Sequence, residues 1–189
     1  MRLALDEDRG QISEMVRERM AWMREQGIPD WPRSNEDVEV IASQAGSGKP
    51  VWVLVSPEGR VIGCTSLYDK TPAWGWSDEE LKQSAYFLAT SFTHPAYRRE
   101  RPGQIMALWA LDRAAHNGID WVRRGTFSHR LMVYYRDEQG WQLVHTPERK
   151  GHRAYLMARP SEPQPELAGV ITDSVVPMSD GCTTKKVNE

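Results

Sequence analysis

The chain has 189 residues, a formal net charge of −2, 40% hydrophobic residues and 26% charged residues. This length suits one well-buried domain with a tail, and the composition is that of a globular protein. The charge balance argues against a general nucleic-acid binder, which would carry a basic excess. No apolar stretch reaches the roughly 20 residues that a membrane span needs, so we expect no membrane partner.

The N-terminal residues and the cysteines indicate a cellular compartment. The first turn is acidic and lacks the apolar segment of a signal peptide. Cys64 and Cys182 have a spacing that fits neither a metal site nor a disulfide framework. The sequence therefore predicts a cytoplasmic protein whose chemistry uses neither a metal nor a cysteine.

Hydrophobic periodicity and turn signals predict alternating strands and helices. In the first helix the near-3.6 period runs through Ile12, Met15, Val16, Arg19, Met20 and Met23. In chain order we expect a strand at 2–5, a helix that Asp6 or Asp8 caps and Gly27 ends, and a second helix that Ser34 or Asn35 caps and that includes Ala45. Strands at 51–56 and 61–68 follow, joined by a hairpin turn at 57–60, and then a strand at 84–93, a helix at 103–117 and a strand at 119–126. Ser128 or His129 caps a short helix that ends before Gly140, and strands at 141–145 and 154–158 form a closing hairpin.

The end of the chain differs in composition from the rest. From residue 161 it is rich in proline, serine and charge, with one apolar stretch at 170–176. Such a segment buries too little apolar surface to fold by itself. The sequence therefore predicts one domain over residues 1–159 and a flexible tail over 160–189.

A strand, a basic loop and a helix follow one another at residues 84–117. The loop carries Arg98, Arg99 and Arg101, and Pro102 and Gly103 stand at the helix entrance. This order directs free backbone N–H groups, the positive end of the helix dipole and guanidinium groups to one point. We therefore expect an anionic ligand there.

The element order and these loop residues resemble the GNAT superfamily of N-acyltransferases over residues 2–159. The superfamily pattern Gln/Arg-x-x-Gly-x-Gly/Ala is matched by Arg98 at its first position and by Gly103 at its last. Arg101 replaces the first glycine, and Pro102 removes one backbone N–H. The resemblance implies an α/β (α+β) fold with a mixed, mostly antiparallel sheet of six to seven strands and about four flanking helices.

The resemblance also implies that acetyl-CoA or another acyl-CoA donates the acyl group. Backbone groups at the end of the 84–93 strand would pair with the pantetheine arm, and the loop would hold the pyrophosphate through its arginines. The implied donor-binding residues are Ser91, Phe92, Thr93, Arg98, Arg99, Glu100, Arg101, Pro102, Gly103 and Gln104.

Farther along, the superfamily has an asparagine, a short helix, a tyrosine and Gly-Phe. Ser128 stands at the asparagine position, and Gly140-Trp141 stand at the end. The tyrosine of that pattern protonates the leaving thiolate, which implies Tyr135 as the general acid, with Tyr134 as the second choice. Neighbouring helical residues face about 100° apart, so only one of the two can point into the site.

The acceptor side of the site has no comparable pattern. We expect Trp31, Trp74 and Trp76 to line the pocket of a small-molecule amine, although each ring could equally pack on the sheet. The base that deprotonates the ammonium stays open, and a water relay would need none. The candidates for that base are His94, His129, Asp30 and Asp69.

Two other readings use the same fold. In the first, an acyl carrier protein brings its phosphopantetheine thioester, and its acidic surface meets arginines of the chain. In the second, the fold has lost the chemistry and senses acyl-CoA or binds a protein partner. The sequence leaves a homodimer open. The arginines named for the carrier are Arg98, Arg99, Arg101, Arg123 and Arg124.

Overall fold

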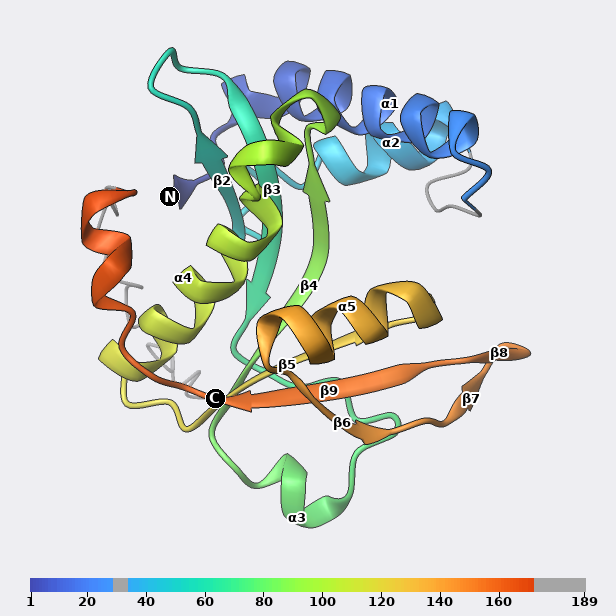
Figure 1. The fold of residues 1–189 in the computed structure, drawn as a ribbon, viewed down its shortest axis with the longest axis vertical. Helices are drawn as coiled ribbons and strands as arrows, with labels where there is room; N and C mark the ends of the chain where they lie inside the picture. Colours follow the sequence, from blue (N-terminus) through green and yellow to red (C-terminus); the bar gives the residue numbers. More distant parts are fainter. Residues whose placement is uncertain (29–33, 172–189) are drawn as a thin grey trace, which may run out of the picture.

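The structure is a computed structural model that describes residues 1–28 and 34–171 (Figure 1). A seven-stranded sheet has the order β1-β2-β3-β4-β5-β9-β6, and only its β4–β5 pair is parallel. The predicted fold class, a mixed and mostly antiparallel sheet flanked by helices, is confirmed. The strands are β1 (Arg2–Leu3), β2 (Val51–Val55), β3 (Val61–Tyr68), β4 (Ala85–Thr93), β5 (Trp121–Thr126), β6 (Gln142–His145), β7 (Glu148–Arg149), β8 (His152–Arg153) and β9 (Tyr155–Pro160).

The helices follow the predicted order, with short 3-10 turns added between them. The capping interactions explain where two of them begin: the side chains of Ser34 and Ser128 accept hydrogen bonds from backbone N–H groups of the following first turns. The helices are η1 (Asp6–Asp8), α1 (Arg9–Glu25), α2 (Asn35–Ala42), α3 (Asp78–Leu81), η2 (Pro95–Glu100), α4 (Pro102–His116), α5 (His129–Gln139) and η3 (Pro165–Gly169).

Alternation along the strands divides the core between the two faces of the sheet. Trp52 of β2 packs with Trp109 of α4, and their ring centroids lie 4.8 Å apart. Its neighbour Val53 packs with α1 and α2 instead. Helices α1 and α2 therefore cover one face, and α4 and α5 cover the other (Figure 1).

A third, smaller cluster lies where the connection between β3 and β4 crosses the sheet. Trp76 of that connection packs on Leu156 and Ala158 of β9. Adjacent residues of a strand point to opposite faces of the sheet. Met157 packs in the core on the α4 and α5 side, whereas its neighbour Leu156 contacts Trp76, so this connection covers the other face.

Strands β4 and β5 pair over only part of their length. Their parallel register runs from Ala85 opposite Trp121 to Leu88 opposite Arg124. Beyond this point β4 continues beside β3 alone, and β5 turns away from it (Figure 1). The last residues of β4 thus have a neighbouring strand on one side only, which leaves main-chain groups on the other side for a ligand.

A bulge in β4 accompanies this separation. The β3–β4 register shifts between Cys64 opposite Phe92 and Ser66 opposite Ala89, and Thr90 has a φ of 48°. The fully buried Thr65 hydroxyl donates to the Ala89 carbonyl at 3.1 Å and lies 2.8 Å from the Ser91 hydroxyl. The Thr65 side chain of β3 therefore holds the irregular backbone of β4 in place.

The chain after β9 returns to helix α4. The Gln164 backbone N–H donates to an Asp112 carboxylate oxygen at 2.8 Å, and Leu167 of η3 is buried in the core cluster of α4. Residues 161–171 of the segment expected as a tail thus lie against α4. The remainder of the tail, residues 172–189, lies outside the described residues.

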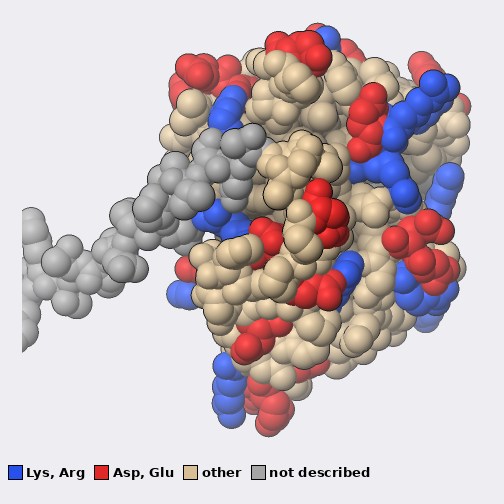
Figure 2. All heavy atoms as spheres, turned by 60° about the vertical axis from the view of Figure 1, so that its left-hand side comes forward, with Lys and Arg blue, Asp and Glu red and all other residues tan. Residues whose placement is uncertain are grey.

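The surface agrees with the small net charge of the chain. On the face shown in Figure 2, basic and acidic side chains are interspersed, and neither sign forms an extended area. Among the helices of residues 1–28 and 34–171, none has the length and apolar character needed to cross a membrane.

The Thr65 hydroxyl should be important for stability because it satisfies two polar groups at the bulge. We expect Thr65→Val to lower the free energy of unfolding by about 1–2 kcal/mol, measured by urea denaturation. Ser91→Ala removes one of the two contacts and should cost less. A Thr65→Val protein as stable as the parent would show that the hydroxyl does not hold the bulge.

Candidate active site

The end of β4 meets the beginning of α4. A Cβ atom placed on Gly103 would lie 3.6 Å from the Thr93 side-chain methyl group, so the strand end and the first helical turn are in near contact. His94 follows Thr93 and begins η2, because its Nδ1 accepts a hydrogen bond from the Ala96 N–H at 3.3 Å. The three segments expected to hold the donor are therefore contiguous in space.

Arg101 links η2 to α4 in the left-handed conformation, with φ 53° and ψ 47°. A side chain at such a backbone costs roughly 1–2 kcal/mol, which glycine avoids. The chain thus keeps at this position the backbone shape that suits a glycine, and adds a guanidinium to it. The following Pro102 fits as the first residue of α4, where no N–H is needed.

The arginines of this loop differ in how they are paired. Arg98 and Arg99 are exposed and form no ion pair with another described residue. Arg101 lies 3.8 Å from Glu138 of α5, and both side chains are more than half exposed. Such exposed pairs contribute little, so all three guanidinium groups are accessible to an anion.

Gln104, in the first turn of α4, lines a hollow of about 320 Å³ together with Glu138 and Gln139 of α5. Its side-chain carbonyl oxygen is buried and accepts no hydrogen bond from the described protein groups. This oxygen is available to a ligand that donates a hydrogen bond.

Tyr135 lies on α5 next to the point where β4 and β5 separate. Its ring packs on the core, and the Arg124 guanidinium carbon is 3.5 Å from the ring centroid. Arg124 is the last β5 residue paired with β4. Tyr134 is also half-buried, and its ring centroid is 5.9 Å from that of Tyr135.

Arg124 is 5% exposed, and its surroundings are largely aromatic. Besides Tyr135, it faces the Trp141 ring at 5.1 Å, and its guanidinium lies 3.5 Å from the Gln139 side-chain oxygen. Burial lowers the pKa of Arg124. The expectation that Arg123 and Arg124 meet a carrier protein is wrong, because both guanidinium groups are inside the protein.

Two of the candidate bases are placed clearly. His94 is 4% exposed, and its Nε2 lies 3.1 Å from a carboxylate oxygen of Glu18 on α1, directly after the donor strand. Asp69 follows β3, whose far end pairs with the beginning of β4 through Tyr68 and Phe87. Asp69 is therefore at the wrong end of β4 to act on a ligand beside Thr93.

The remaining candidates are not brought to the site. His129 is exposed and packs against Tyr155, while Ser128 provides the helix cap. Asp30 and Trp31 lie outside the described residues. Burial raises the pKa of the Cys64 thiol to about 12, which leaves this cysteine protonated and unreactive.

The two loop tryptophans pack on the sheet face opposite to Tyr135. Trp76 is 8% exposed and lies under the Arg123 guanidinium at 4.6 Å. Trp74 is half-buried beneath the Arg149 guanidinium at 3.9 Å. The structure therefore does not bring these rings together with Tyr135.

Arg123 fastens this connection to β5. Its guanidinium donates to the Thr71 hydroxyl at 3.1 Å, the Glu80 backbone carbonyl at 2.8 Å and the Gln83 side-chain oxygen at 2.6 Å. The three acceptors are neutral and come from the connection between β3 and β4. Arg123 thus acts as a structural anchor for this segment.

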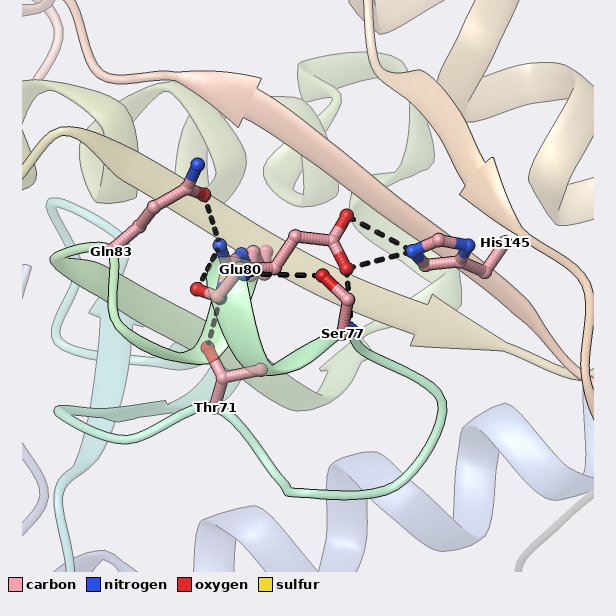
Figure 3. A network of polar contacts seen from close by, with 6 residues as sticks. Thr71, Ser77, Glu80, Gln83 and His145 are labelled. Carbon is pink, nitrogen blue, oxygen red and sulfur yellow. Dashed lines mark hydrogen bonds and ion pairs between the residues drawn. The ribbon is translucent and has the colours of Figure 1, made fainter.

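The same connection is also tied to β6. The Glu80 carboxylate accepts from the Ser77 N–H at 2.7 Å and lies 2.8 Å from His145 Nε2 (Figure 3). Burial alone would raise the pKa of Glu80, but the contacts with Ser77 and His145 outweigh it and hold that pKa below its usual range. The ionised carboxylate therefore stabilises the folded position of α3.

Within the described residues, no group of three or more His, Cys, Asp or Glu side chains is placed to hold a metal ion. What this part of the chain does provide is an open strand end, a basic helix entrance and a tyrosine beside a buried cation. This set of groups suits the binding of an anionic thioester and the protonation of its leaving group.

Comparison with known proteins assigns the family. The chain belongs to the acetyltransferase (GNAT) family, whose model matches residues 12–141. No curated protein shows significant sequence similarity to it. The resemblance predicted from the sequence is therefore confirmed, and membership in this family implies an N-acyltransferase.

Solved structures share the fold at low identity. A GNAT family acetyltransferase from Listeria monocytogenes 4b F2365 is 19% identical, with a TM-score of 0.66 over 84% of this chain and 92% of its own. The yncA protein from Salmonella typhimurium, solved with its cofactor acetyl-CoA, is 16% identical, with a TM-score of 0.56 over 85% and 92% of the two chains. Aminoglycoside 6'-acetyltransferase type Ii is 15% identical, with a TM-score of 0.54 over 83% and 92%. The TM-scores show a common fold at low sequence identity.

Sequence reasoning missed two α1 residues near the site. Glu18 contacts His94, and the next residue, Arg19, is half-buried, so that burial lowers its pKa. Arg19 occupies a position where the helical period calls for an apolar residue. This mismatch could have drawn attention to Arg19 in the sequence, because a charge on the apolar face of a helix needs a partner or a ligand.

Glu80 gives the connection between β3 and β4 a pH-dependent stability. Because its pKa is lowered in the folded state, its contribution is complete above the unfolded value of about 4.3 and is lost as the pH falls through the folded value. We expect Glu80→Gln to lower the unfolding free energy at pH 7 by about 1 kcal/mol and to match the parent near pH 3. Urea denaturation at both pH values measures this difference.

The control for this experiment is Glu79→Gln, an exposed carboxylate of the same helical turn. Its stability should follow that of the parent at both pH values. A Glu80→Gln deficit that is equally large at pH 3 would contradict the electrostatic account.

Proposed function

We propose that this protein is an acetyl-CoA-dependent N-acetyltransferase that acts on the amine of a small molecule by direct attack in a ternary complex. The observation that carries the proposal is the position of Tyr135, beside the point at which β4 and β5 separate. Family membership supplies the reaction class, and the fully protonated Cys64 argues against an acyl-cysteine route through that residue.

The donor would bind along the end of β4 and across the entrance of α4. Main-chain groups of Ser91 and Thr93 lie in the part of β4 that has β3 as its neighbouring strand and is no longer paired with β5. Arg98 and Arg99 are free to pair with the pyrophosphate. Because Pro102 lacks an N–H, side-chain charge would contribute more here than backbone donors do.

Bound acetyl-CoA supplies the acyl group as a thioester, and the amine nitrogen forms the new bond to its carbonyl carbon as the C–S bond breaks. Backbone N–H groups at the end of β4 would stabilise the negative charge on the carbonyl oxygen. The Tyr135 hydroxyl would give its proton to the departing thiolate. A phenol of ordinary pKa, about 10, can protonate a thiolate whose conjugate acid has a pKa near 8.5.

The proton of the attacking ammonium needs a separate acceptor. His94 directly follows Thr93 in the chain and contacts Glu18, whose side chain is 41% exposed. A water between the amine and this pair would carry the proton out. We therefore place the base function on Glu18 and His94 rather than on Asp69 or His129.

A carrier-protein donor is the second candidate. The observation that favours it is the Arg101-Pro102 entrance, which has fewer backbone donors than the superfamily loop and would suit a donor without adenosine diphosphate. The carrier would have to use the exposed Arg98, Arg99 and Arg101.

Calorimetric titration with acetyl-CoA tests the donor assignment. We expect saturable binding by the parent protein, and weakening by about tenfold or more when Arg98→Ala and Arg99→Ala are combined, because two charged contacts to phosphate are lost. Arg17→Ala, which removes an exposed arginine paired with Glu39 on α1, should bind as the parent does. No detectable binding by the parent would reject acetyl-CoA, and release of thiol from an acyl-loaded carrier would then support the second candidate.

Tyr135→Phe tests the general acid. We expect kcat to fall by about 100-fold, measured as thiol release with an accepted amine, because proton donation typically contributes this much. The dissociation constant of acetyl-CoA should stay the same, since the ring is kept. Tyr134→Phe is the matched control, and a larger loss in that variant would transfer the role to Tyr134.

A further inference from the structure

The β7–β8 hairpin extends from β9 to the edge of the molecule (Figure 1). Its register places Arg149 directly opposite His152, so both side chains lie on the same face of the hairpin. The Arg149 guanidinium carbon lies 3.9 Å from the Trp74 ring centroid, and the His152 ring centroid lies 6.4 Å from that of Phe127. These four residues, together with Lys150 at the tip of the hairpin, form what we call the hairpin surface.

Phe127 gives this surface an exposed apolar ring. It is 58% exposed, and among the described residues it is the only phenylalanine, tryptophan or tyrosine in the exposed class. Leu131, in the first turn of α5, is 40% exposed. An aromatic ring left in water beside arginines has the composition found at the centre of protein interfaces.

The same region carries an excess of positive charge. The hairpin and the first turn of α5 contain Arg130, Arg149, Lys150 and Arg153, against the single acid Glu148, which lies opposite Arg153 in the register. None of these four basic side chains forms an ion pair or a hydrogen bond with a residue that the structure describes. Because the whole chain has a net charge of −2, this excess is local and selects an acidic partner.

The tip of the hairpin adds an independent observation. Lys150 and Gly151 form a two-residue turn in which both φ angles are positive, 49° and 75°. Asparagine and glycine adopt this backbone easily, whereas lysine is strained in it. Residues with such strain are concentrated at functional sites. The chain thus has an exposed ammonium at a position where a neutral residue would be more stable.

We propose that the hairpin surface binds an acidic segment of a partner polypeptide, and that an aromatic or large aliphatic side chain of this segment packs on Phe127. The negative net charge of the chain disfavours nucleic acid as the partner, since nucleic-acid binding depends on a basic excess. A short acidic segment needs only the local charge of the hairpin and of the α5 start. The surface lies outside the groups assigned to acetyl transfer, so this inference does not depend on the proposed function.

Fluorescence anisotropy with the full chain tests the inference. The probe is a labelled peptide of repeated Glu-Glu-Tyr triplets, and the comparison ligands have the same length: Gln-Gln-Tyr triplets, Glu-Glu-Ser triplets and oligouridine RNA. We expect saturable binding of the first peptide with a dissociation constant of about 100 μM or lower. Binding should weaken as the salt concentration rises, and both comparison peptides should bind at least about fivefold more weakly.

Variants locate the contact. Lys150→Asn removes the charge and suits the turn, so we expect it to keep or raise the melting temperature while it weakens peptide binding by about threefold or more. Phe127→Ala should weaken binding by about fivefold or more, because it removes the exposed ring. Lys49→Asn is the matched control, since Lys49 is an exposed lysine before β2, three strands away from β5, and it should bind as the parent does.

Failure of the Glu-Glu-Tyr peptide to bind would overturn the inference, as would equal binding of the glutamine or the serine peptide. Tighter binding of oligouridine than of the peptide would also overturn it, because the surface would then be a nucleic-acid site. Peptide binding that Lys150→Asn and Phe127→Ala both leave unchanged would place the contact elsewhere on the chain and reject the hairpin surface. None of these results decides the acetyl-transfer assignment, which the acetyl-CoA titration tests separately.

Discussion

The site depends on the loss of pairing between two parallel strands. Strands β4 and β5 share four register positions, and beyond Leu88 and Arg124 their directions differ. The bulge at Thr90 adds local twist to β4, while the β3 hydroxyl of Thr65 keeps the bulged strand fastened to the rest of the sheet. Unpaired main-chain groups, normally a liability at a sheet edge, would in the proposed function bind an extended ligand.

Buried arginines have two different uses in β5. Arg123 donates hydrogen bonds to three neutral oxygens of one long connection and so fixes that connection to the sheet. Its neighbour Arg124 points to the other face, meets aromatic rings and has no such set of acceptors. The same residue type is therefore held by neutral oxygens on one face and mainly by aromatic rings on the other.

Much of the fold could be predicted from the sequence, because turn signals and periodicity are local. The hairpin around residues 57–60 is of this kind, and so are the two helix starts at 34–35 and 128–129, where the structure has the serine as the cap. The site was harder, since burial and side-chain pairing depend on distant segments. From the sequence, Arg123 and Arg124 were candidates for contact with a carrier protein, whereas both side chains are buried in the structure. Asp69 seemed able to reach the pocket until the antiparallel register placed it at the far end of β4.

The left-handed residue at the entrance of α4 has an evolutionary consequence. A glycine at position 101 would relieve the backbone strain, yet the chain has an arginine there. The free energy involved, roughly 1–2 kcal/mol, is a sizeable part of the margin by which a domain of this size stays folded. Stability alone would favour glycine, so in the proposed function ligand binding by the guanidinium would compensate for the strain. In the proposed function, a single substitution of Arg101 by glycine would therefore raise stability and lower ligand affinity.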